Sequence, residues 1–416
     1  MSDKILVENL TKIFGPNPEQ ALDMLEKGLD KAEIYERTRT TVGVHDASFA
    51  VPAGEIFVVM GLSGSGKSTL VRMLNRLISP TTGKVTVEGQ DVTAMDSSAL
   101  RALRRDRMSM VFQHFALLPH RTVAENAAFG LKLRGSGKNE RRQAALKVLE
   151  QVGLKEWADS MPQELSGGMQ QRVGLARALA AETDILLMDE PFSALDPLIR
   201  REMQGELLEL QRSVHKTIVF ITHDLNEALI LGDRIAIMRG GRFVQVGTPQ
   251  EIVSAPADDY VSAFTQDVDR SRVFTAGMIA QPPTASLHRS ERPSEAINKI
   301  KEAGARALHV TSGEGRVLGL VRVDDIEQAP ESTNSVGDVM SQEFPSCTEG
   351  AELHQVYRLC AQGDPIAVLD EEGRLMGVLE PLDLFAHLAT GEEQSGSASE
   401  SVIHDSETEA QVASQA

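Results

Sequence analysis

The residues of this sequence that point most clearly to chemistry form a glycine-rich loop at 61–69, which reads Gly-Leu-Ser-Gly-Ser-Gly-Lys-Ser-Thr. The loop follows the apolar run Ile56–Met60 and precedes a helical pattern, which is the context of a phosphate-binding loop. Its glycines let successive backbone N–H groups converge on phosphates, and the helix N-terminus adds positive potential. Lys67 is expected to reach the β- and γ-phosphates of a nucleotide, and Ser68 to ligate Mg²⁺. The expected phosphate-binding residues are Gly61, Leu62, Ser63, Gly64, Ser65, Gly66, Lys67, Ser68 and Thr69.

A second apolar run, residues 185–188, ends in two adjacent carboxylates, Asp189 and Glu190. An apolar run of this length predicts a buried strand, which holds both acids at the carboxyl edge of a parallel sheet, where ligands bind. Asp189 suits the Mg²⁺ shell, directly or through water. Glu190, the next residue, points elsewhere and is placed to polarise an attacking water. Phosphoryl transfer chiefly needs positioning and charge neutralisation, which these acids and Lys67 would supply.

A third motif, Leu-Ser-Gly-Gly-Met-Gln-Gln-Arg at 165–172, predicts a second anion site. Ser166 is expected to cap a helix whose N-terminal amides are left bare by Gly167 and Gly168. The chain already has one such site in its glycine-rich loop. At this point the sequence resembles the ABC ATPases, in which this signature binds the γ-phosphate held by the loop of the other subunit. The resemblance covers nearly all of residues 5–265.

The resemblance implies roles for further residues. Gln113 matches the residue that links the nucleotide to the membrane subunits, and it joins Ser68 and Asp189 around Mg²⁺. Asp196, in Ser-Ala-Leu-Asp at 193–196, matches the loop that crosses the dimer, and His223 matches the switch histidine. The expected catalytic residues are Glu190, His223, Gln113 and Lys67.

An aromatic residue ahead of the phosphate-binding loop stacks the adenine in relatives. Phe14, in Lys-Ile-Phe-Gly at 12–15, matches by local context, although an insert separates it from Gly61. Packing of Phe14 in the core is the alternative.

Residues 1–265 alternate short β-branched runs with helical patterns, which predicts an α/β fold with a largely parallel sheet. One insert interrupts this order. Asn17, Pro18 and Gln20 read as a helix start with a capping box, and Asp30 with Glu33 repeats the signal. Residues 17–40 are therefore expected to form a small helical hairpin between two strands.

The sequence changes character after residue 266, and a repeat follows a predicted linker at 266–285. Residues 315–321 match residues 373–379 at an offset of 58, and Asp325 falls on Asp383. Each unit reads as helix, strand, glycine turn, strand, helix, with helices at 296–303 and 353–360. The strands are expected at 307–310, 317–321, Ile366–Leu369 and Leu375–Leu379.

The insert, residues 42–48, residues 112–119 and the repeat together resemble the ATP-binding subunits of glycine betaine/proline betaine/choline importers. The repeat at 286–390 resembles a tandem CBS module of α+β structure, which in this group regulates transport through ionic strength or a bound nucleotide. CBS nucleotide sites pair a Thr or Ser with an Asp three residues later. Arg322 and Glu380 occupy the hydroxyl positions here, which disfavours adenosine binding and leaves a structural or ionic-strength-sensing role open.

Composition limits the partners. The 416 residues carry a formal charge of −18, which argues against nucleic acid, because phosphate backbones need a basic face. The two cysteines, Cys347 and Cys360, lack metal-ligand spacing and are interpreted as thiols of a cytosolic protein. No signal-peptide pattern and no apolar run of about 20 residues occurs, so membrane passage is expected of other chains.

Residues 391–416 contain six acidic residues and no Lys or Arg, which predicts a disordered tail. It would act either as a salt-screened electrostatic latch or as a solubilising segment.

These observations predict an ABC ATPase domain at 1–265 that powers import of a quaternary-ammonium osmolyte or choline, with ATP and Mg²⁺ bound at composite sites of a homodimer. The expected partners are transmembrane permease subunits and a periplasmic or extracellular solute-binding protein. The expected place is the cytoplasmic face of the plasma (inner) membrane. The alternatives are an ATPase for another solute, such as amino acids, and a soluble ABC protein outside transport.

Overall fold

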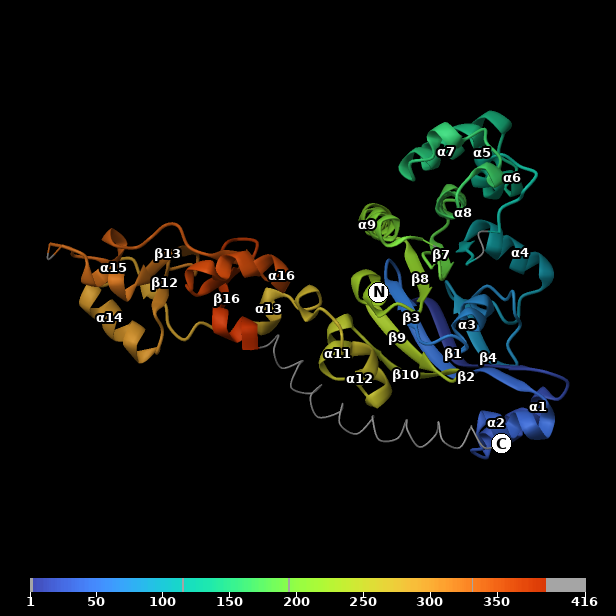
Figure 1. The fold of residues 1–416 in the computed structure, drawn as a ribbon, viewed down its shortest axis with the longest axis horizontal. Helices are drawn as coiled ribbons and strands as arrows, with labels where there is room; N and C mark the ends of the chain where they lie inside the picture. Colours follow the sequence, from blue (N-terminus) through green and yellow to red (C-terminus); the bar gives the residue numbers. More distant parts are fainter. Residues whose placement is uncertain (1–2, 114–115, 194, 331, 387–416) are drawn as a thin grey trace, which may run out of the picture. The chain divides into compact units, whose positions relative to one another are not determined.

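The computed structural model describes residues 3–113, 116–193, 195–330 and 332–386 of the chain (Figure 1). The chain divides into two compact units, residues 1–265 and residues 266–416, and each is described by itself. The predicted acidic tail at 391–416 lies outside the described residues. Within the described part of the chain, no helix has both the length and the apolar character needed to cross a membrane.

A six-stranded sheet forms the centre of the first unit and contains β3 (Ile56–Met60), β6 (Met108–Val111), β7 (Ile185–Asp189), β8 (Thr217–Thr222), β9 (Arg234–Arg239) and β10 (Arg242–Gly247). The strand order is β10-β9-β3-β8-β7-β6, and all strands run parallel except β10 at one edge. Every residue of β3, β7 and β8 is buried, as in parallel sheets covered on both faces. The predicted α/β class is therefore confirmed.

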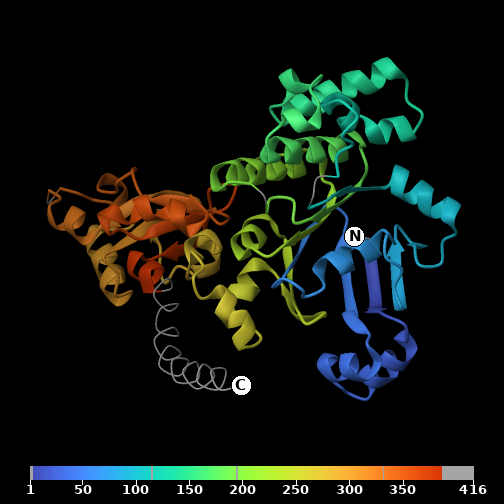
Figure 2. The ribbon, with the colours of Figure 1, turned by 45° about the vertical axis from the view of Figure 1, so that its right-hand side comes forward.

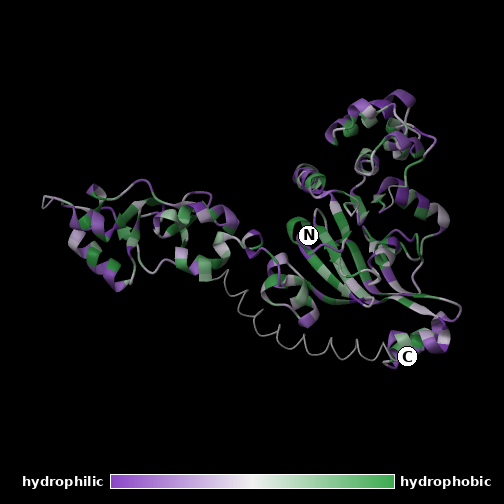
Figure 3. Ribbon diagram, in the orientation of Figure 1, coloured by the Kyte–Doolittle hydropathy of each residue, from purple (hydrophilic) through white to green (hydrophobic). Residues whose placement is uncertain are grey.

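A second, antiparallel sheet contains β1 (Asp3–Phe14), β2 (Thr41–Pro52), β4 (Thr82–Val87) and β5 (Gln90–Asp91), in the order β2-β1-β4-β5. Helix α3 (Lys67–Leu74) places Leu70 and Leu74 in a core that both sheets share. Phe49 of β2 stacks on Phe57 of β3 with ring centroids 4.8 Å apart. Figure 3 shows the strands of this unit as mainly hydrophobic, in keeping with that core. The shared core fixes the start of α3 against the end of β3.

The remaining helices of the first unit form a helical arm and a set of connections between strands. The arm, which Figures 1 and 2 both show at the end of the unit opposite the insert, contains α5 (Val123–Ala127), α6 (Phe129–Leu133), α7 (Lys138–Gln151) and α8 (Gly167–Ala180). The connections are α4 (Ser97–Asp106), α9 (Pro197–Val214) and α10 (Leu225–Leu231), and the unit ends with α11 (Pro249–Ser254) and α12 (Asp259–Thr265) after β10.

The insert forms the expected pair of helices, α1 (Pro18–Glu26) and α2 (Lys31–Thr38), between β1 and β2. Asp30 and Glu33 make the predicted capping box at the start of α2. The predicted start of α1 is confirmed, with Asn17 at the N-cap position and Pro18 first in the helix, but the Asn17 side chain makes no capping hydrogen bond with the first turn. Pro18 at the first helical position already lacks an N–H, so that turn has one fewer donor to satisfy.

The second unit consists of two three-stranded sheets with short helices. The first repeat contains β11 (Leu287–His288), β12 (Ala307–Thr311), β13 (Val317–Arg322), α14 (Pro293–Glu302) and α15 (Val323–Glu327). The second contains β14 (Ser346–Thr348), β15 (Ile366–Leu369), β16 (Leu375–Leu379) and α16 (Leu353–Val356), which continues as a 3-10 helix over Tyr357–Gln362. In each repeat a short parallel strand is added to the predicted hairpin.

The two repeats face each other across a local two-fold relation. Arg316 pairs with Arg374 in an antiparallel bridge, and these residues are equivalent under the 58-residue offset. Residues 266–285, expected as a linker, contain α13 (Ala276–Ile279) and contact the second repeat, where the Gln281 N–H donates to the Val378 carbonyl (2.9 Å). This segment is therefore packed as part of the second unit.

Candidate active site

The carboxyl ends of β3, β8, β7 and β6 lie side by side, because these strands are parallel neighbours. Strand β3 leads into the 61–69 loop, β7 ends at Asp189 and Glu190, and β8 leads to His223. Gln113 follows β6 by two residues. Residues far apart in the sequence therefore meet at one edge of the sheet, where ligands bind in such folds.

A cavity of about 630 Å³ opens at this edge, which is a size typical of small-molecule sites. Most of the residues expected from the sequence line it, and Thr41, Val42 and Gly43 of β2 join them. The lining consists of Phe14, Thr41, Val42, Gly43, Leu62, Ser63, Gly64, Gly66, Lys67, Ser68, Thr69, Gln113, Glu190 and His223.

The 61–69 loop takes its shape from glycines in backbone conformations that other residues rarely adopt. Gly61 has φ +149° and Gly66 has φ +106°. A side chain at Gly61 would overlap the carbonyl oxygen of Met238, and one at Gly66 would overlap that of Gly43. Helix α3 begins directly after Gly66, and no described side chain caps it. The amides of its first turn are therefore left to bind an anion, which the helix dipole also favours.

Lys67 lies buried beneath the loop, with 4% of its side chain exposed. Its ammonium donates to the carbonyls of Gly61 (2.7 Å) and Leu62 (3.1 Å) and lies 3.8 Å from Glu190 Oε1. Burial lowers the pKa of Lys67, while the charges of Glu190 and Asp189 raise it. The ammonium is held by neutral carbonyl oxygens, and a phosphate oxygen would bind it more strongly because it adds a negative charge on the acceptor side.

Asp189 is completely buried and is satisfied by two neighbours on α3. It accepts hydrogen bonds from Ser68 Oγ (2.7 Å) and from the Arg72 guanidinium (3.0 Å). Hard oxygen donors of this kind suit Mg²⁺, and Ser68 and Asp189 would hold that ion together with phosphate oxygens. The sequence reasoning missed Arg72, although its place four residues after Ser68 puts both on one helix face.

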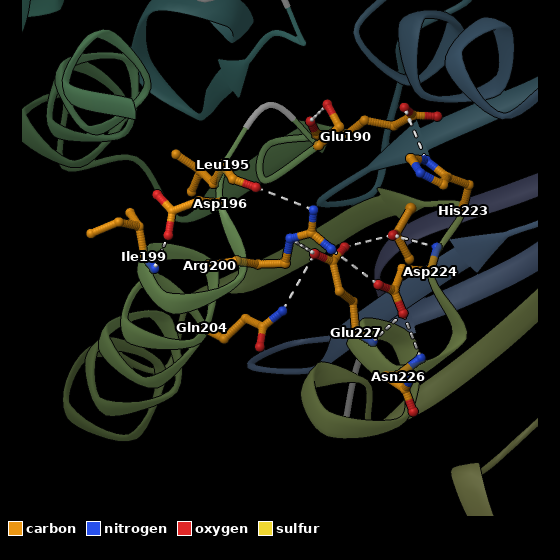
Figure 4. A network of polar contacts seen from close by, with 12 residues as sticks. Glu190, Leu195, Asp196, Ile199, Arg200, Gln204, His223, Asp224, Asn226 and Glu227 are labelled. Carbon is orange, nitrogen blue, oxygen red and sulfur yellow. Dashed lines mark hydrogen bonds and ion pairs between the residues drawn. The ribbon is translucent and has the colours of Figure 1, made fainter. Parts of the chain in front are cut away.

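Glu190 is the centre of the polar contacts in the cavity. Its Oε2 accepts from Gln113 Nε2 (3.1 Å) and lies 3.2 Å from His223 Nδ1 (Figure 4). Its backbone has φ +46°, a left-handed conformation that costs about 1–3 kcal/mol in a residue other than glycine. The Glu190 N–H donates to the Ile221 carbonyl (3.0 Å), which anchors this turn to β8. The expected metal ligand Gln113 thus directs its amide nitrogen at Glu190.

Ser166 and Asp196 cap helices, and among the described residues neither lines the cavity. Ser166 Oγ accepts from the Met169 N–H (3.3 Å) at the start of α8, where Gly167 and Gly168 leave the first turn open. Asp196 accepts from the Leu198 N–H (3.1 Å) at the start of α9. One copy of the chain therefore does not bring these predicted residues to its own cavity.

Phe14 lies in the cavity wall despite its distance from Gly61 in the sequence. Phe14 at the end of β1 pairs with Thr41 at the start of β2, so the two ends of the insert lie next to each other in the sheet. The ring is 40% exposed, has the Lys12 ammonium 5.1 Å from its centroid, and sits on Gly43, where a side chain would come within 2.8 Å of it. Such exposure is unlike a core phenylalanine and leaves part of the residue exposed at the cavity.

The insert supports the same wall. Ile34 of α2 shares a buried apolar cluster with Val42 of β2. The Lys31 ammonium donates to the Val42 carbonyl (2.7 Å), and burial together with the charge of Arg242 lowers the pKa of Lys31 to about 8. The helices that interrupt the sheet are thus attached to the strand that borders the cavity.

Comparison with known proteins identifies the class of protein. A family model described as ABC transporter matches residues 44–193, and one described as CBS domain matches residues 336–390. Among solved structures, the ATP-binding cassette MJ0796, in a dimeric post-hydrolysis state with ADP and Pi, is 32% identical. The match has a TM-score of 0.52 and covers 59% of this chain and 98% of that one. The first unit is an ABC-type ATPase domain.

Relatives that span nearly the whole chain define the family. The glycine betaine transport ATP-binding protein OpuAA of Bacillus subtilis (strain 168) is 49% identical over 94% of this chain and 93% of its own. The glycine betaine/proline betaine transport system ATP-binding protein ProV of Escherichia coli (strain K12) is 47% identical over 91% and 96%. The glycine betaine/carnitine transport ATP-binding protein GbuA of Listeria monocytogenes is 46% identical over 94% and 98%. This chain belongs to the family of ATP-binding proteins of glycine betaine and related transport systems.

An ion pair joins the two repeats of the CBS-containing unit. Arg322 of the first repeat binds Asp364 of the second through Nε (2.9 Å) and a terminal guanidinium nitrogen (2.6 Å). The 58-residue offset relates Arg322 to Glu380 and Asp364 to Arg306, so the equivalent pair has its charges reversed. Burial and the charge of Asp383 raise the pKa of Glu380, whereas the charge of Arg306 lowers it.

Arg322, which stands where a CBS nucleotide site would carry a hydroxyl residue, is therefore occupied by contacts with two carboxylates. The Arg322 N–H donates to the Asp325 carboxylate (3.0 Å), and the guanidinium is held by Asp364. The sequence disfavours adenosine binding at this position, and this stays a prediction. The ion pair between Arg322 and Asp364 supports it.

Replacement of Phe14 tests its role in the cavity. We expect Phe14→Ala to weaken ATP binding by about 1–3 kcal/mol, the range for one base stacked on one aromatic ring, and Phe14→Trp to preserve it. The measurement is a calorimetric titration of the full chain with ATP. Phe243→Ala removes a phenylalanine that packs against the core, and it serves as the matched control. An unchanged affinity in Phe14→Ala would leave Phe14 a packing residue.

The cross-repeat pair predicts a charge-swap effect on stability. Arg322→Asp and Asp364→Arg should each lower the free energy of unfolding of the second unit by about 1.5–3 kcal/mol, because each places two like charges together at positions only partly open to water. The double variant should recover most of the loss. Urea unfolding of the full chain measures all three, with Arg358→Asp as an exposed control in the second repeat. Additive losses in the double variant would contradict the pairing.

Proposed function

We propose that this chain is the ATP-hydrolysing subunit that powers import of a quaternary-ammonium osmolyte, such as glycine betaine or proline betaine, or of choline, through a separate permease. The observation that carries the chemistry is the placement of Glu190 between Lys67, Gln113 and His223 at the edge of one cavity. The names of the relatives, all ATP-binding proteins of such transport systems, support the solute class.

The residues of the cavity would have different roles in phosphoryl transfer. The amides of the 61–69 loop and the Lys67 ammonium would bind the β- and γ-phosphates, and Phe14 would stack the adenine. Ser68 and Asp189 would hold Mg²⁺, which when bound neutralises phosphate charge. Glu190 would orient the attacking water and take its proton, within a geometry kept by Gln113 and His223.

A second copy of the chain would complete each site. The open helix N-terminus at Ser166, Gly167 and Gly168 suits an anion, and among the described residues it does not border its own cavity. In a head-to-tail homodimer it would bind the γ-phosphate held by Lys67 of the partner, and Asp196 would lie at the same interface. The dimeric state of the related cassette MJ0796 supports this arrangement.

The assembly would lie on the cytoplasmic face of the plasma (inner) membrane, with transmembrane permease subunits and a periplasmic or extracellular solute-binding protein. The formal charge of −18 disfavours nucleic acid as a partner. An ATPase for another solute and a soluble ABC protein outside transport are the alternatives, and the relatives favour the importer of quaternary-ammonium solutes.

Glu190→Gln should abolish ATP turnover, by about a hundredfold or more, while leaving a stable ATP-bound dimer. Glutamine keeps an oxygen for Gln113 and has no proton acceptor of comparable strength. Size-exclusion chromatography with and without ATP measures the dimer, and phosphate release measures turnover. Lys67→Ala, which loses the phosphate cation, should form no such dimer. Near wild-type hydrolysis by Glu190→Gln would show that the assigned base is wrong.

The solute class is tested with the chain and its co-purifying permease in vesicles. We expect glycine betaine, proline betaine, carnitine or choline to stimulate ATP hydrolysis at one or more ionic strengths, because solute binding outside must be communicated to the ATPase. Amino acids serve as the comparison set. Stimulation by amino acids alone would assign another solute, and capture of ribosomes or DNA without a permease would assign a soluble function.

A further inference from the structure

Arg200, in the first turn of α9, joins the two segments that follow the candidate catalytic residues. One terminal guanidinium nitrogen donates to the Leu195 carbonyl (3.3 Å), in the segment that follows Glu190. The other donates to the Asp224 carboxylate (3.3 Å), in the residue after His223. Figure 4 shows Arg200 reaching from α9 between these two segments. A single side chain thus bridges the loop ahead of α9 and the loop that carries the histidine.

A buried carboxylate keeps Arg200 in this position. Glu227 of α10 is 4% exposed, and its Oε1 lies 3.7 Å from Arg200 Nε. Burial and the charge of Asp224 raise the pKa of Glu227, and hydrogen bonds from Thr222 and Gln204 and the charge of Arg200 offset only part of that rise. A carboxylate so far from water needs compensating charge, so Arg200 cannot leave without a cost.

The same network fixes the residues on both sides of His223 in the sequence. Thr222 Oγ1 donates to Glu227 Oε2 (2.6 Å) and accepts from the Asp224 N–H (3.0 Å). Asp224 also caps α10 through the Asn226 N–H (2.8 Å). His223 stands between these two anchored residues, with 56% of its side chain exposed and its Nδ1 3.2 Å from Glu190 Oε2. Its position is therefore set by neighbours that Arg200 holds.

We propose that Arg200 is a positioning residue that couples the loop at Leu195 and Asp196 to His223, so that a shift of that loop moves the histidine relative to Glu190. This inference rests on the proposed function, because that loop is the one that would meet the second copy in the dimer. Contact of this loop with the second copy would thereby change the position of His223 relative to Glu190 in the same chain.

The test compares Arg200→Gln, Asp224→Asn and their combination by steady-state ATP hydrolysis of the full chain. Asparagine still caps a helix, so Asp224→Asn removes the charge and keeps α10. We expect each single variant to lower kcat by about ten- to a hundredfold, with KM for ATP within about twofold. The combination should be no slower than the worse single variant, because both residues act as one unit. Arg200→Lys should recover part of the loss.

Arg201→Gln is the matched control, since Arg201 is the next residue of α9, is exposed, and pairs with none of the described side chains. Equal kcat values for Arg200→Gln and Arg201→Gln, or multiplicative losses in the combination, would overturn the coupling. A rise in KM alone would do the same. The dimer formed by Glu190→Gln separates the two claims: if it forms and Arg200→Gln turns over normally, only the coupling fails. If Glu190→Gln forms no dimer, the proposed function fails first.

Discussion

Two adjacent carboxylates at the end of β7 have to be stabilised where little of either side chain reaches water. Asp189 is completely buried, and Ser68 and Arg72 of α3 supply its hydrogen bonds. Glu190 is 15% exposed and has its own set of partners in Lys67, Gln113 and His223. Neighbouring anions of this kind repel each other, so each needs its own positively charged or hydrogen-bonding partners. The positions of the loop, the helix and two further strand ends follow from that requirement.

The backbone makes this separation possible. Along a strand, side chains alternate between faces, so a regular continuation would fix Glu190 to the pleat of β7. The left-handed conformation of Glu190 (φ +46°) turns the chain instead, and its N–H is anchored on Ile221 of β8. The strain is local, whereas the benefit is a carboxylate that faces the Lys67 ammonium. Strain kept at a functional site in this way is a recurring feature of catalytic centres.

Sequence patterns predicted those elements that are encoded by residues close together in the sequence. The continuous apolar runs before Gly61 and Asp189 predicted buried parallel strands, and Asp30 with Glu33 predicted the helix start of α2. Contacts between distant segments have no such signal. Arg72 and Arg200 are ordinary helix residues until the fold brings Asp189 and Glu227 beside them.

Very short elements escaped prediction for a different reason. Strands β11 and β14 have two and three residues, too few to show a period of two. The helix expected at 353–360 ends at Val356 and continues as a tighter 3-10 turn. Residues 266–285 read as a linker because of Pro282 and Pro283, yet Gln281 pairs with Val378. Local breaker residues do not reveal the partner that orders a segment.

The helix N-termini of α3 and α8 both begin next to glycines, and among the described residues that of α3 borders the cavity whereas that of α8 does not. That of α3 follows the glycine-rich loop, and that of α8 follows Ser166, whose hydroxyl satisfies the Met169 N–H while Gly167 and Gly168 leave the turn accessible. Unpaired amides and the helix dipole favour an anion at α8 as much as at α3. In the proposed dimer a second copy would supply that anion without any new element, because its own cavity would hold the phosphate.

Hydrolysis would then depend on association, and the packing around α8 shows how association could reach the catalytic residues. Leu195 packs closely against Gly168, where a β-carbon in place of the glycine hydrogen would lie 3.1 Å from the Leu195 side chain. The carbonyl of the same Leu195 accepts a hydrogen bond from Arg200. The first turn of α8 is thereby linked to the loop that Arg200 holds, so a phosphate bound at that turn would act on a segment already connected to His223.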